Sequence, residues 1–160
     1  MQLILAAVGR MKKGPEQELA TRYLDRVSKS GKSVGLTQTK VIEIVESRAG
    51  SSDARKREEA ENLLDRLPEN CVIFAFDERG NSPNSRQFAK LVGDELDLGK
   101  GALALIIGGP DGLSPQIRER AKKVISFGAA TFPHQLVRIL VLEQIYRAVT
   151  ILTNHPYHRD

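Results

Sequence analysis

Short apolar runs recur along the chain at spacings of about 30 residues, and segments with helical periodicity separate them. None of the runs alternates polar with apolar residues, which is typical of strands that are buried on both faces. Strands that alternate with helices predict an α/β fold, with one parallel sheet covered by helices on both sides. The predicted strands are Leu3–Val8, Val41–Val45, Cys71–Phe76, Ala102–Ile107 and a weaker Lys123–Phe127.

The intervening segments carry helix signals. In Pro15–Lys29 a proline stands in the first turn, and Leu19, Tyr23 and Val27 recur at helical spacing. The segment Gly31–Thr39 is polar and predicts a loop or the entry to an edge strand. A chain of 160 residues with this pattern predicts a single domain over residues 1–160. The other predicted helices are Ser52–Leu67, Ser85–Leu98, Ser114–Lys123 and Gln135–Thr153.

The composition is that of a soluble globular protein, with 41% hydrophobic and 28% charged residues. Arg138, Glu143 and Arg147 interrupt the longest apolar stretch, so we expect no membrane span. The start MQLILAAVGRMKK lacks the features of a signal peptide, so we expect a cytoplasmic protein. The single cysteine, Cys71, predicts a buried structural thiol, and no ligand pattern predicts a metal site. The net charge of +4 is compatible with a nucleic-acid partner but does not establish one.

Three predicted strands end in segments that could hold a ligand. In open α/β sheets, ligands bind beyond the carboxyl ends of the strands. The segments are Phe76–Gly80, Gly108–Ser114 and Phe127–Phe132. In the second of them, Gly108 and Gly109 would let the backbone approach a ligand closely. The pattern alone leaves a plain tight turn and a ligand loop as equal alternatives there.

Familiar motifs fail on spacing. The glycine segment lacks the GK[ST] of a phosphate loop and does not match GxGxxG. Asp111, Ser114 and His134 have the residue types of a hydrolase, but no GxSxG elbow is present. The bare sequence pattern therefore names no ligand.

The last thirty residues combine an unusually apolar helix with a polar end. Eleven of the seventeen positions from Leu136 to Leu152 are apolar, more than the stripe by which a surface helix packs on its own domain. We therefore expect a second subunit to bury the excess. The tail that follows holds His155, Tyr157, His158 and Arg159, although chain ends usually fray.

Three motifs in this order carry a resemblance. The segments IIGGPDGLS (Ile106–Ser114), TFPHQLVRILVLEQIYRA (Thr131–Ala148) and NHPYHR (Asn154–Arg159) resemble the RlmH family of ribosomal RNA large-subunit methyltransferases, the minimal SPOUT methyltransferases. The resemblance implies a knotted homodimer that uses S-adenosylmethionine. It further implies methylation of N3 of one pseudouridine in helix 69 of 23S rRNA, on the assembled ribosome.

The resemblance also assigns residues. It implies that Tyr157 or His158 accepts the proton that leaves N3 and that Arg159 stabilises the negative charge that develops there, while His155 has a structural role. The tail would then lie beside the cofactor loops, either those of its own subunit or those of the partner. The cofactor-binding residues would be Phe76, Gly108, Gly109, Gly112, Phe127, Gly128, Ala129, Ala130, Thr131 and Phe132.

The other charged residues singled out in the sequence have less definite roles. Arg10 and Lys12 follow the first strand, and we expect them to hold rRNA phosphates. For Arg138 a contact with the cofactor edge or RNA phosphate and a salt bridge across the dimer remain equal alternatives. Glu143 and Arg147 stand four residues apart and predict a local ion pair.

Other functions remain open from the sequence. The first alternative is a SPOUT methyltransferase of another RNA, such as tRNA. The second is a non-catalytic RNA-binding or assembly factor that keeps the fold. The third is a small α/β module that binds a phosphate-rich nucleotide.

Overall fold

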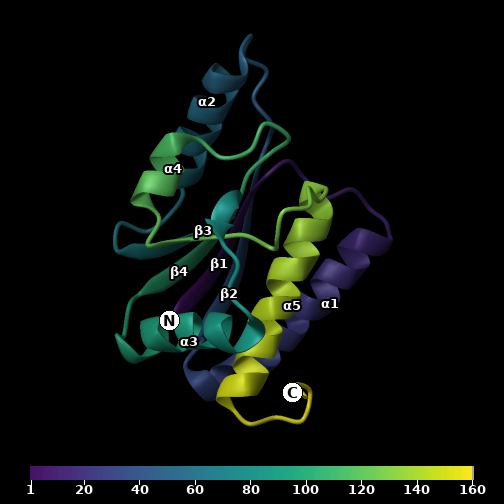
Figure 1. Cartoon of the computed structure of the whole chain (residues 1–160), viewed down its shortest axis with the longest axis vertical. Coiled ribbons are helices and arrows are strands. Elements are labelled where there is room, and N and C mark those ends of the chain that lie inside the picture. Colours follow the sequence, from purple (N-terminus) through teal and green to yellow (C-terminus); the bar gives the residue numbers. More distant parts are fainter. Residues whose placement is uncertain (160) are drawn as a thin grey trace.

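Five parallel strands form one sheet in the order β2-β1-β4-β3-β5 in the computed structural model, which describes residues 1–159 (Figure 1). This confirms the predicted α/β fold. The strands are β1 (Gln2–Val8), β2 (Gln38–Ile44), β3 (Cys71–Asn81), β4 (Ala102–Ile107) and β5 (Lys123–Ile125). The helices are α1 (Pro15–Ser30), α2 (Ser52–Leu64), α3 (Ser85–Asp97), α4 (Pro115–Arg120) and α5 (His134–Leu152), and a 3₁₀ turn covers Gly31–Val34.

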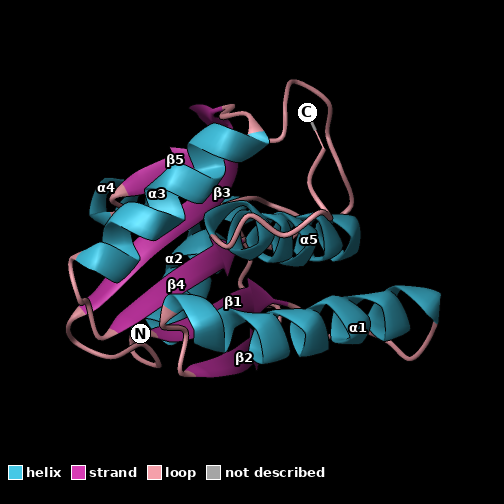
Figure 2. Ribbon diagram, turned by 90° about the horizontal axis from the view of Figure 1, so that it is seen from below, coloured by secondary structure: helices cyan, strands magenta, loops and turns pink. Residues whose placement is uncertain are grey.

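Helices cover both faces of the sheet, as the apolar runs predict. On one face α1, α3 and α5 bury a cluster that includes Val27, Phe88 and Ile145. On the other face α2 and α4 bury a second cluster around Leu63 and Ile117. In Figure 2, α2 and α4 lie behind the strands and α1, α3 and α5 lie on the other side. The central strand β4 is buried along its whole length, because both of its faces and both of its edges are covered.

Side-chain caps start α2, α3 and α4 where the sequence predicts these helices, and at α3 the side chain of Asn84 accepts from the N–H of Gln87. The hydroxyl of Ser51 accepts a hydrogen bond from the N–H of Ala54 at the start of α2. Ser114 caps α4 in the same way, with proline at the first helical position. The helix α4 ends at Arg120, earlier than predicted, because the N–H of Lys122 already bonds to β3 as β5 begins.

Two strands are longer than the apolar runs. The strand β2 begins at Gln38, inside the predicted polar loop, because an edge strand has a side open to solvent and does not need a continuous apolar run. The strand β3 continues beyond Phe76 to Asn81, which pairs with Ile125 after a break in register. A Cβ atom on Gly80 would lie 2.5 Å from the backbone N of Ile125, so only glycine fits this close approach.

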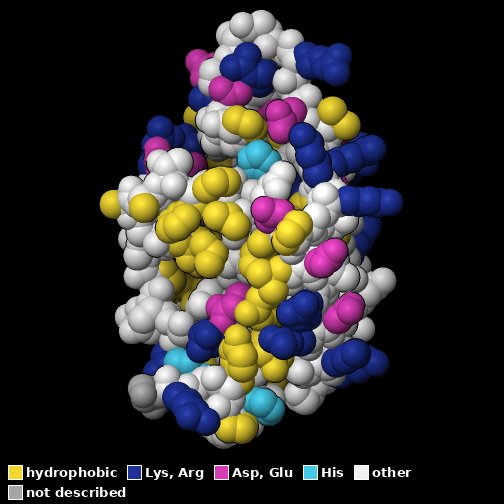
Figure 3. Space-filling model, turned by 90° about the vertical axis from the view of Figure 1, so that its right-hand side faces the viewer, with side chains coloured by type: hydrophobic (Ala, Val, Ile, Leu, Met, Phe, Trp, Pro, Cys, Tyr) yellow, Lys and Arg dark blue, Asp and Glu magenta, His cyan; other side chains and the backbone are white. Residues whose placement is uncertain are grey.

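The helix α5 buries six of its eleven apolar positions inside its own subunit, between α1 and α3, so a second subunit would have only the remainder to cover. A smaller part stays outside. Leu136 is 42% exposed and Phe132 39% exposed, and Val137 and Leu140 are half-buried. We call these four residues, three on α5 and Phe132 just before it, the apolar face of α5. Figure 3 shows apolar side chains gathered on this side of the molecule.

No helix within residues 1–159 is long and apolar enough to cross a membrane. No three His, Cys, Asp or Glu side chains in that range come together in a way that could hold a metal ion. Cys71 stands half-buried at the start of β3, and burial raises the pKa of its thiol.

Candidate active site

The second half of β3 and the loops after β4 and β5 surround a cavity of about 730 Å³ at the carboxyl edge of the sheet. The segment Phe76–Gly80, predicted to follow a strand, belongs to β3 itself. The start of α5 closes it through His134 and Val137. Small-ligand sites usually have volumes in this range. Of the predicted cofactor residues, only Ala129 is not in the lining. Those that line the cavity are Phe76, Gly108, Gly109, Gly112, Phe127, Gly128, Ala130, Thr131 and Phe132.

Glycines shape the loop after β4. The N–H of Gly112 bonds to the carbonyl of Gly109 at 2.9 Å and closes a tight turn over Pro110 and Asp111. Gly112 has a φ of +82°, which glycine adopts without strain. A Cβ atom on Gly108 would lie 2.8 Å from the carbonyl carbon of Gly112. The loop is therefore a tight turn whose backbone also lines the cavity. A tight turn and a ligand loop, the two alternatives that the sequence left open, do not exclude each other here.

Aromatic rings form part of the apolar wall. The rings of Phe76 and Phe127 stack with their centroids 5.5 Å apart and an interplanar angle of 17°. Leu113 is buried beside them and Phe132 is partly exposed at the mouth. Such walls suit a flat or aliphatic ligand group.

The loop after β5 presents backbone to the cavity. The hydroxyl of Ser126 accepts from the N–H of Gly128 at 3.1 Å and donates to its carbonyl at 2.9 Å, which holds the loop open. Gly128 has a φ of +115°. Within the described chain, no protein acceptor takes a hydrogen bond from the backbone N–H groups of residues 129–132. These groups are exposed and can bond to a ligand.

Arg118 connects β3 to the loop after β4. Arg118 on α4 lies 3.3 Å from the carboxylate of Asp77, which follows the buried part of β3. Its guanidinium also donates to the carbonyl of Leu113 in the loop after β4. The side chain of Asp77 is only 6% exposed, so this pair is largely shielded from solvent.

The C-terminal tail folds back on α5. The hydroxyl of Tyr157 donates to Oε1 of Glu143 at 3.2 Å, and its ring packs edge-on against Tyr146 with centroids 4.7 Å apart. The guanidinium of Arg147 lies over the same ring at 5.0 Å. Nδ1 of His158 stands 3.4 Å from Nη1 of Arg147. Arg159 is exposed.

Glu143 organises this end of the helix. Its Oε1 accepts from Nε of Arg147 at 3.0 Å and from Nη2 at 2.5 Å, which confirms the predicted ion pair. Burial raises the pKa of Tyr157, and hydrogen bonds with Tyr23 and Glu143 and the charge of Glu143 act in the same direction. The phenol of Tyr157 therefore stays protonated at neutral pH.

The tail and the cavity of one subunit lie at different parts of α5. Among the described residues of the tail, 153–159, none lines the cavity. The cavity meets α5 at Val137, and His158 meets it at Arg147. Ten residues of helix separate these positions by about 15 Å along the axis. Figure 1 shows the C-terminus at the end of α5 opposite to the loops beside α4.

Comparisons with known proteins agree with this geometry. The sequence pattern of the predicted SPOUT methyltransferase family matches residues 1–158. The chain is 52% identical over its full length to the ribosomal RNA large subunit methyltransferase H of Allorhizobium ampelinum and covers all of that protein. With the protein of the same name from Rhizobium etli it shares 54% identity over 159 residues, which cover 99% of both chains.

The chain belongs to the SPOUT methyltransferase family.

The crystal structure of a probable methyltransferase from Bordetella pertussis has the same fold, with a TM-score of 0.50 at 15% identity over 92% of this chain and 95% of that one. A probable methylase family protein from Haemophilus influenzae gives the same score and identity over 99% of this chain and 70% of that one. A SPOUT methyltransferase needs a place for its methyl donor, and the cavity lies where strand-end loops of an open α/β sheet bind ligands.

The position of Arg138 contradicts the roles expected for it in this SPOUT methyltransferase. The residue is 1% exposed and does not line the cavity. Nη1 donates to Glu43 at 2.6 Å, and Nη2 donates to the carbonyls of Val8 at 2.6 Å and Gly9 at 2.7 Å. The side chain is enclosed by its own subunit, so an RNA phosphate or a second subunit cannot reach it in this arrangement. Helical periodicity could not predict this position, because it does not reveal that Glu43 and the carbonyls of Val8 and Gly9 lie beneath the helix.

Arg10 and Lys12 lie where an RNA contact is feasible for this SPOUT methyltransferase. Both are exposed in the loop after β1, at the same edge of the sheet as the cavity. The positive φ of Gly9 turns the chain out of β1, and the N–H of Met11 bonds to Glu43 at 3.0 Å. The loop that carries the two cations is therefore held at its base.

Sequence reasoning missed the contribution of α2. Lys56 lines the cavity, and Arg55 pairs with Asp111 in the loop after β4. Charged residues fill most of α2, so its pattern predicts a solvated surface helix and singles out neither cation. The one available signal was Asp111, an acidic residue at the tip of a glycine turn.

Proposed function

We propose that the chain uses S-adenosylmethionine to methylate N3 of a pseudouridine in helix 69 of 23S rRNA, on the assembled ribosome. The observation that carries the proposal is the 52% identity, over the whole chain, to a protein named ribosomal RNA large subunit methyltransferase H. That name supports large-subunit rRNA as the substrate. The target base, its N3 atom and the knot of the chain rest on the resemblance of the three motifs and stay predictions.

The residues around the cavity fit S-adenosylmethionine. Its adenine would lie among Phe76, Leu113 and Phe132, where the wall is apolar. The exposed backbone N–H groups of residues 129–132 would bond to the polar ring edge. A Cβ on Gly108 would collide with Gly112, so the cradle accepts a ligand only with glycine there. When bound, the cofactor supplies a methyl group on a positively charged sulfur.

The tail residues would act on the acceptor. N3 of pseudouridine carries a proton that must leave before its lone pair can attack. We assign the proton acceptor to His158, because the phenol of Tyr157 is protonated and already donates to Glu143. Nδ1 of His158 faces Arg147, a donor, so this contact must open before Nδ1 can take the proton. Arg159 would stabilise the anionic base, and Tyr157 would anchor the tail.

A homodimer would complete the site. Two observations support it: the tail lies along α5 from the cavity of its own subunit, and the apolar face of α5 adjoins that cavity. Pairing of these faces across a two-fold axis would bury Leu136 and Phe132 twice. It would also carry the tail of one subunit toward the cavity of the other. Positioning of the two reactants by such a composite site would supply much of the rate acceleration.

Methylation of purified ribosomes tests the proposal. Assembled ribosomes with and without the pseudouridine, and tRNA as a control, are incubated with the protein and isotope-labelled S-adenosylmethionine. We expect one labelled methyl group on helix 69 by mass spectrometry of rRNA fragments, and none on tRNA. Label on tRNA alone would favour a different RNA substrate. Ribosome binding without label or cofactor affinity would instead indicate a non-catalytic assembly factor.

A further inference from the structure

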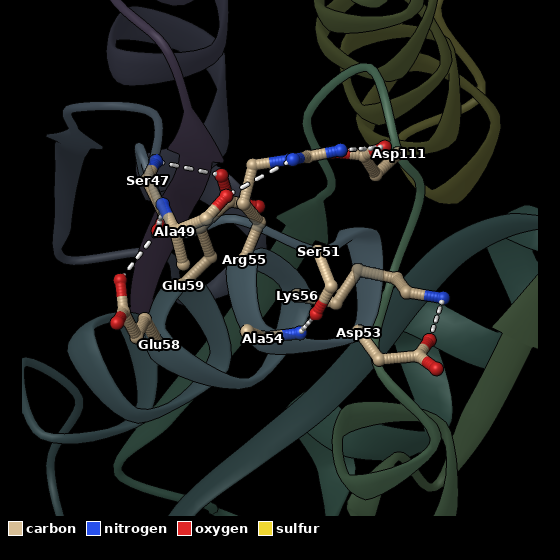
Figure 4. Close-up of polar contacts among 10 residues, drawn as sticks. All are labelled: Ser47, Ala49, Ser51, Asp53, Ala54, Arg55, Lys56, Glu58, Glu59 and Asp111. Carbon is tan, nitrogen blue, oxygen red and sulfur yellow. Dashed lines mark hydrogen bonds and ion pairs between the residues drawn. The ribbon is translucent and has the colours of Figure 1, made fainter.

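Arg55 on α2 and Asp111 in the loop after β4 form an ion pair that has no role in the proposed reaction. Nε of Arg55 lies 2.6 Å from Oδ2 of Asp111, and Nη2 donates to Oδ1 at 3.0 Å. Two parallel hydrogen bonds of this kind define the orientation of both groups, unlike a single contact. Nη1 of Arg55 donates to the carbonyl of Ala49 at 3.0 Å. All three nitrogens of the guanidinium therefore have a partner (Figure 4).

Asp111 occupies the exposed tip of the glycine turn. The base of the turn is packed already, because a Cβ on Gly109 would lie 2.9 Å from Val8. Nothing lies within 4 Å of a Cβ on Gly112, so the outer side of the turn is open. Arg55 holds the tip against α2, and it lowers the pKa of Asp111 chiefly through their hydrogen bonds.

Arg55 is itself held by a firm support. Ser51 caps the first turn of α2, and its carbonyl accepts a hydrogen bond from the N–H of Arg55 at 2.9 Å. The N–H of Ser47 donates to Glu59 at 2.9 Å, and its hydroxyl donates to Glu58. The connection between β2 and α2 is thereby fastened to the helix from both sides, as Figure 4 shows. The backbone that carries Arg55 is therefore fixed, and the contacts with Asp111 and Ala49 hold its guanidinium.

We propose that Arg55 is a positioning residue for the methyl-donor site and that it acts through Asp111 on the loop Gly108–Leu113. This inference rests on the proposed function, because it takes the cavity as the site of S-adenosylmethionine. Without the pair, the tip of the loop would sample other positions, and one wall of the cavity would lose its shape. The cofactor would bind less tightly, although neither side chain needs to touch it.

A purely structural ion pair is the competing explanation. The side chains of Arg55 and Asp111 are 30% and 26% exposed, and pairs this accessible to water contribute little to global stability. Variants at both positions should therefore fold. A positioning role predicts a change in cofactor affinity without an equal change in ribosome affinity, which a general loss of stability would not produce.

The test compares Arg55→Ala, Arg55→Lys, Asp111→Asn and the double variant Arg55→Ala/Asp111→Asn with the wild-type protein. Isothermal titration calorimetry gives the Kd for S-adenosylmethionine, and methylation kinetics give KM for cofactor and for ribosomes. We expect Kd and the cofactor KM to rise about tenfold in each single variant, below the roughly 100-fold cost of a misplaced reacting group. Lysine keeps the charge but not the double hydrogen bond, so it should rescue little.

Two controls accompany these variants. Lys90→Ala breaks an exposed ion pair with Asp94 on α3, away from the cavity, and should leave cofactor affinity unchanged. The double variant should bind no more weakly than Arg55→Ala, because both changes remove one interaction. If the wild-type protein binds S-adenosylmethionine and both Arg55→Ala and Asp111→Asn bind it equally well, the positioning role is wrong but the proposed cofactor site stands. Absence of cofactor binding by the wild-type protein overturns the proposed cofactor site together with the inference.

Discussion

Arg138 on α5 and Glu43 on β2 stand 95 positions apart in the sequence and form an ion pair of 2.6 Å inside the subunit. The same carboxylate oxygen of Glu43 accepts the N–H of Met11, in the loop that carries Arg10 and Lys12. Arg138 also holds the carbonyls at the end of β1. This pair joins the start of α5, which closes the cavity, to the basic loop beside it.

Replacement of Arg138 should therefore destabilise the fold. In Arg138→Met, Glu43 and the two carbonyls lose their donor, and we expect the free energy of unfolding to fall by about 3 kcal/mol. Urea denaturation followed by circular dichroism measures the change, with Lys90→Met as an exposed control. If Arg138→Met leaves stability unchanged but weakens RNA binding, Arg138 contacts RNA after all, and its buried position in this structure does not describe its role.

The two candidate proton acceptors should differ in their effects. Tyr157→Phe should keep the single-turnover rate within about threefold, whereas His158→Ala should lower it at least 100-fold, as loss of a general base does. Burial raises the pKa of Tyr157 above that of a free phenol, so its proton is retained until beyond about pH 10. Tyr157→Phe and the wild-type protein should thus show the same pH–rate profile below that pH. A large loss of rate in Tyr157→Phe alone would reverse the assignment.

Removal of the tail should separate folding from activity. A chain that ends at Asn154 keeps the whole of α5 and should melt and assemble like the wild-type protein, but it should not methylate ribosomes. Mixing it with Ala130→Trp, whose indole would block the cavity, tests which subunit supplies the tail. If the sites are composite, random mixing should restore about a quarter of the sites, because half of the dimers are mixed and each has one complete site. No recovery would mean that each subunit uses its own tail.

The apolar face of α5 should carry the dimer. Leu136→Asp places a charge where the proposed interface would exclude water, and we expect a shift to monomer with a loss of activity. Light scattering coupled to size-exclusion chromatography measures the mass. Leu98→Asp is the matched control, since Leu98 is 60% exposed beyond α3 and away from α5. A dimer that survives Leu136→Asp would require a different interface.

Charge removal in the basic loop should affect RNA binding in a salt-dependent way. In Arg10→Ala/Lys12→Ala, two phosphate contacts disappear, so the slope of log affinity against log salt should decrease by about 2. Ribosome binding measured from low to physiological salt gives this slope, and cofactor affinity should stay at the wild-type value. The same slope in variant and wild type would remove both residues from the RNA interface.

Local signals in the sequence predict much of this fold. The apolar runs specify strands with buried faces, and Ser51, Ser114 and Pro115 mark helix starts, because these effects depend on near neighbours in the chain. The glycines after β4 can be recognised as ligand-competent for the same reason. The extension of β3 to Asn81 could not be predicted, since it depends on pairing with Ile125, far along the chain.

The sequence alone, read through its periodicity and its motifs, was enough for the α/β class, the loops after β4 and β5 and the family. Only the tertiary structure showed that Arg138 is buried, that Arg55 holds Asp111 and that the tail rests on Glu143. Strands and caps follow from interactions among residues close in sequence. The environment of a charged side chain depends instead on which distant segments pack around it, so the same arginine could lie on a surface or inside a core.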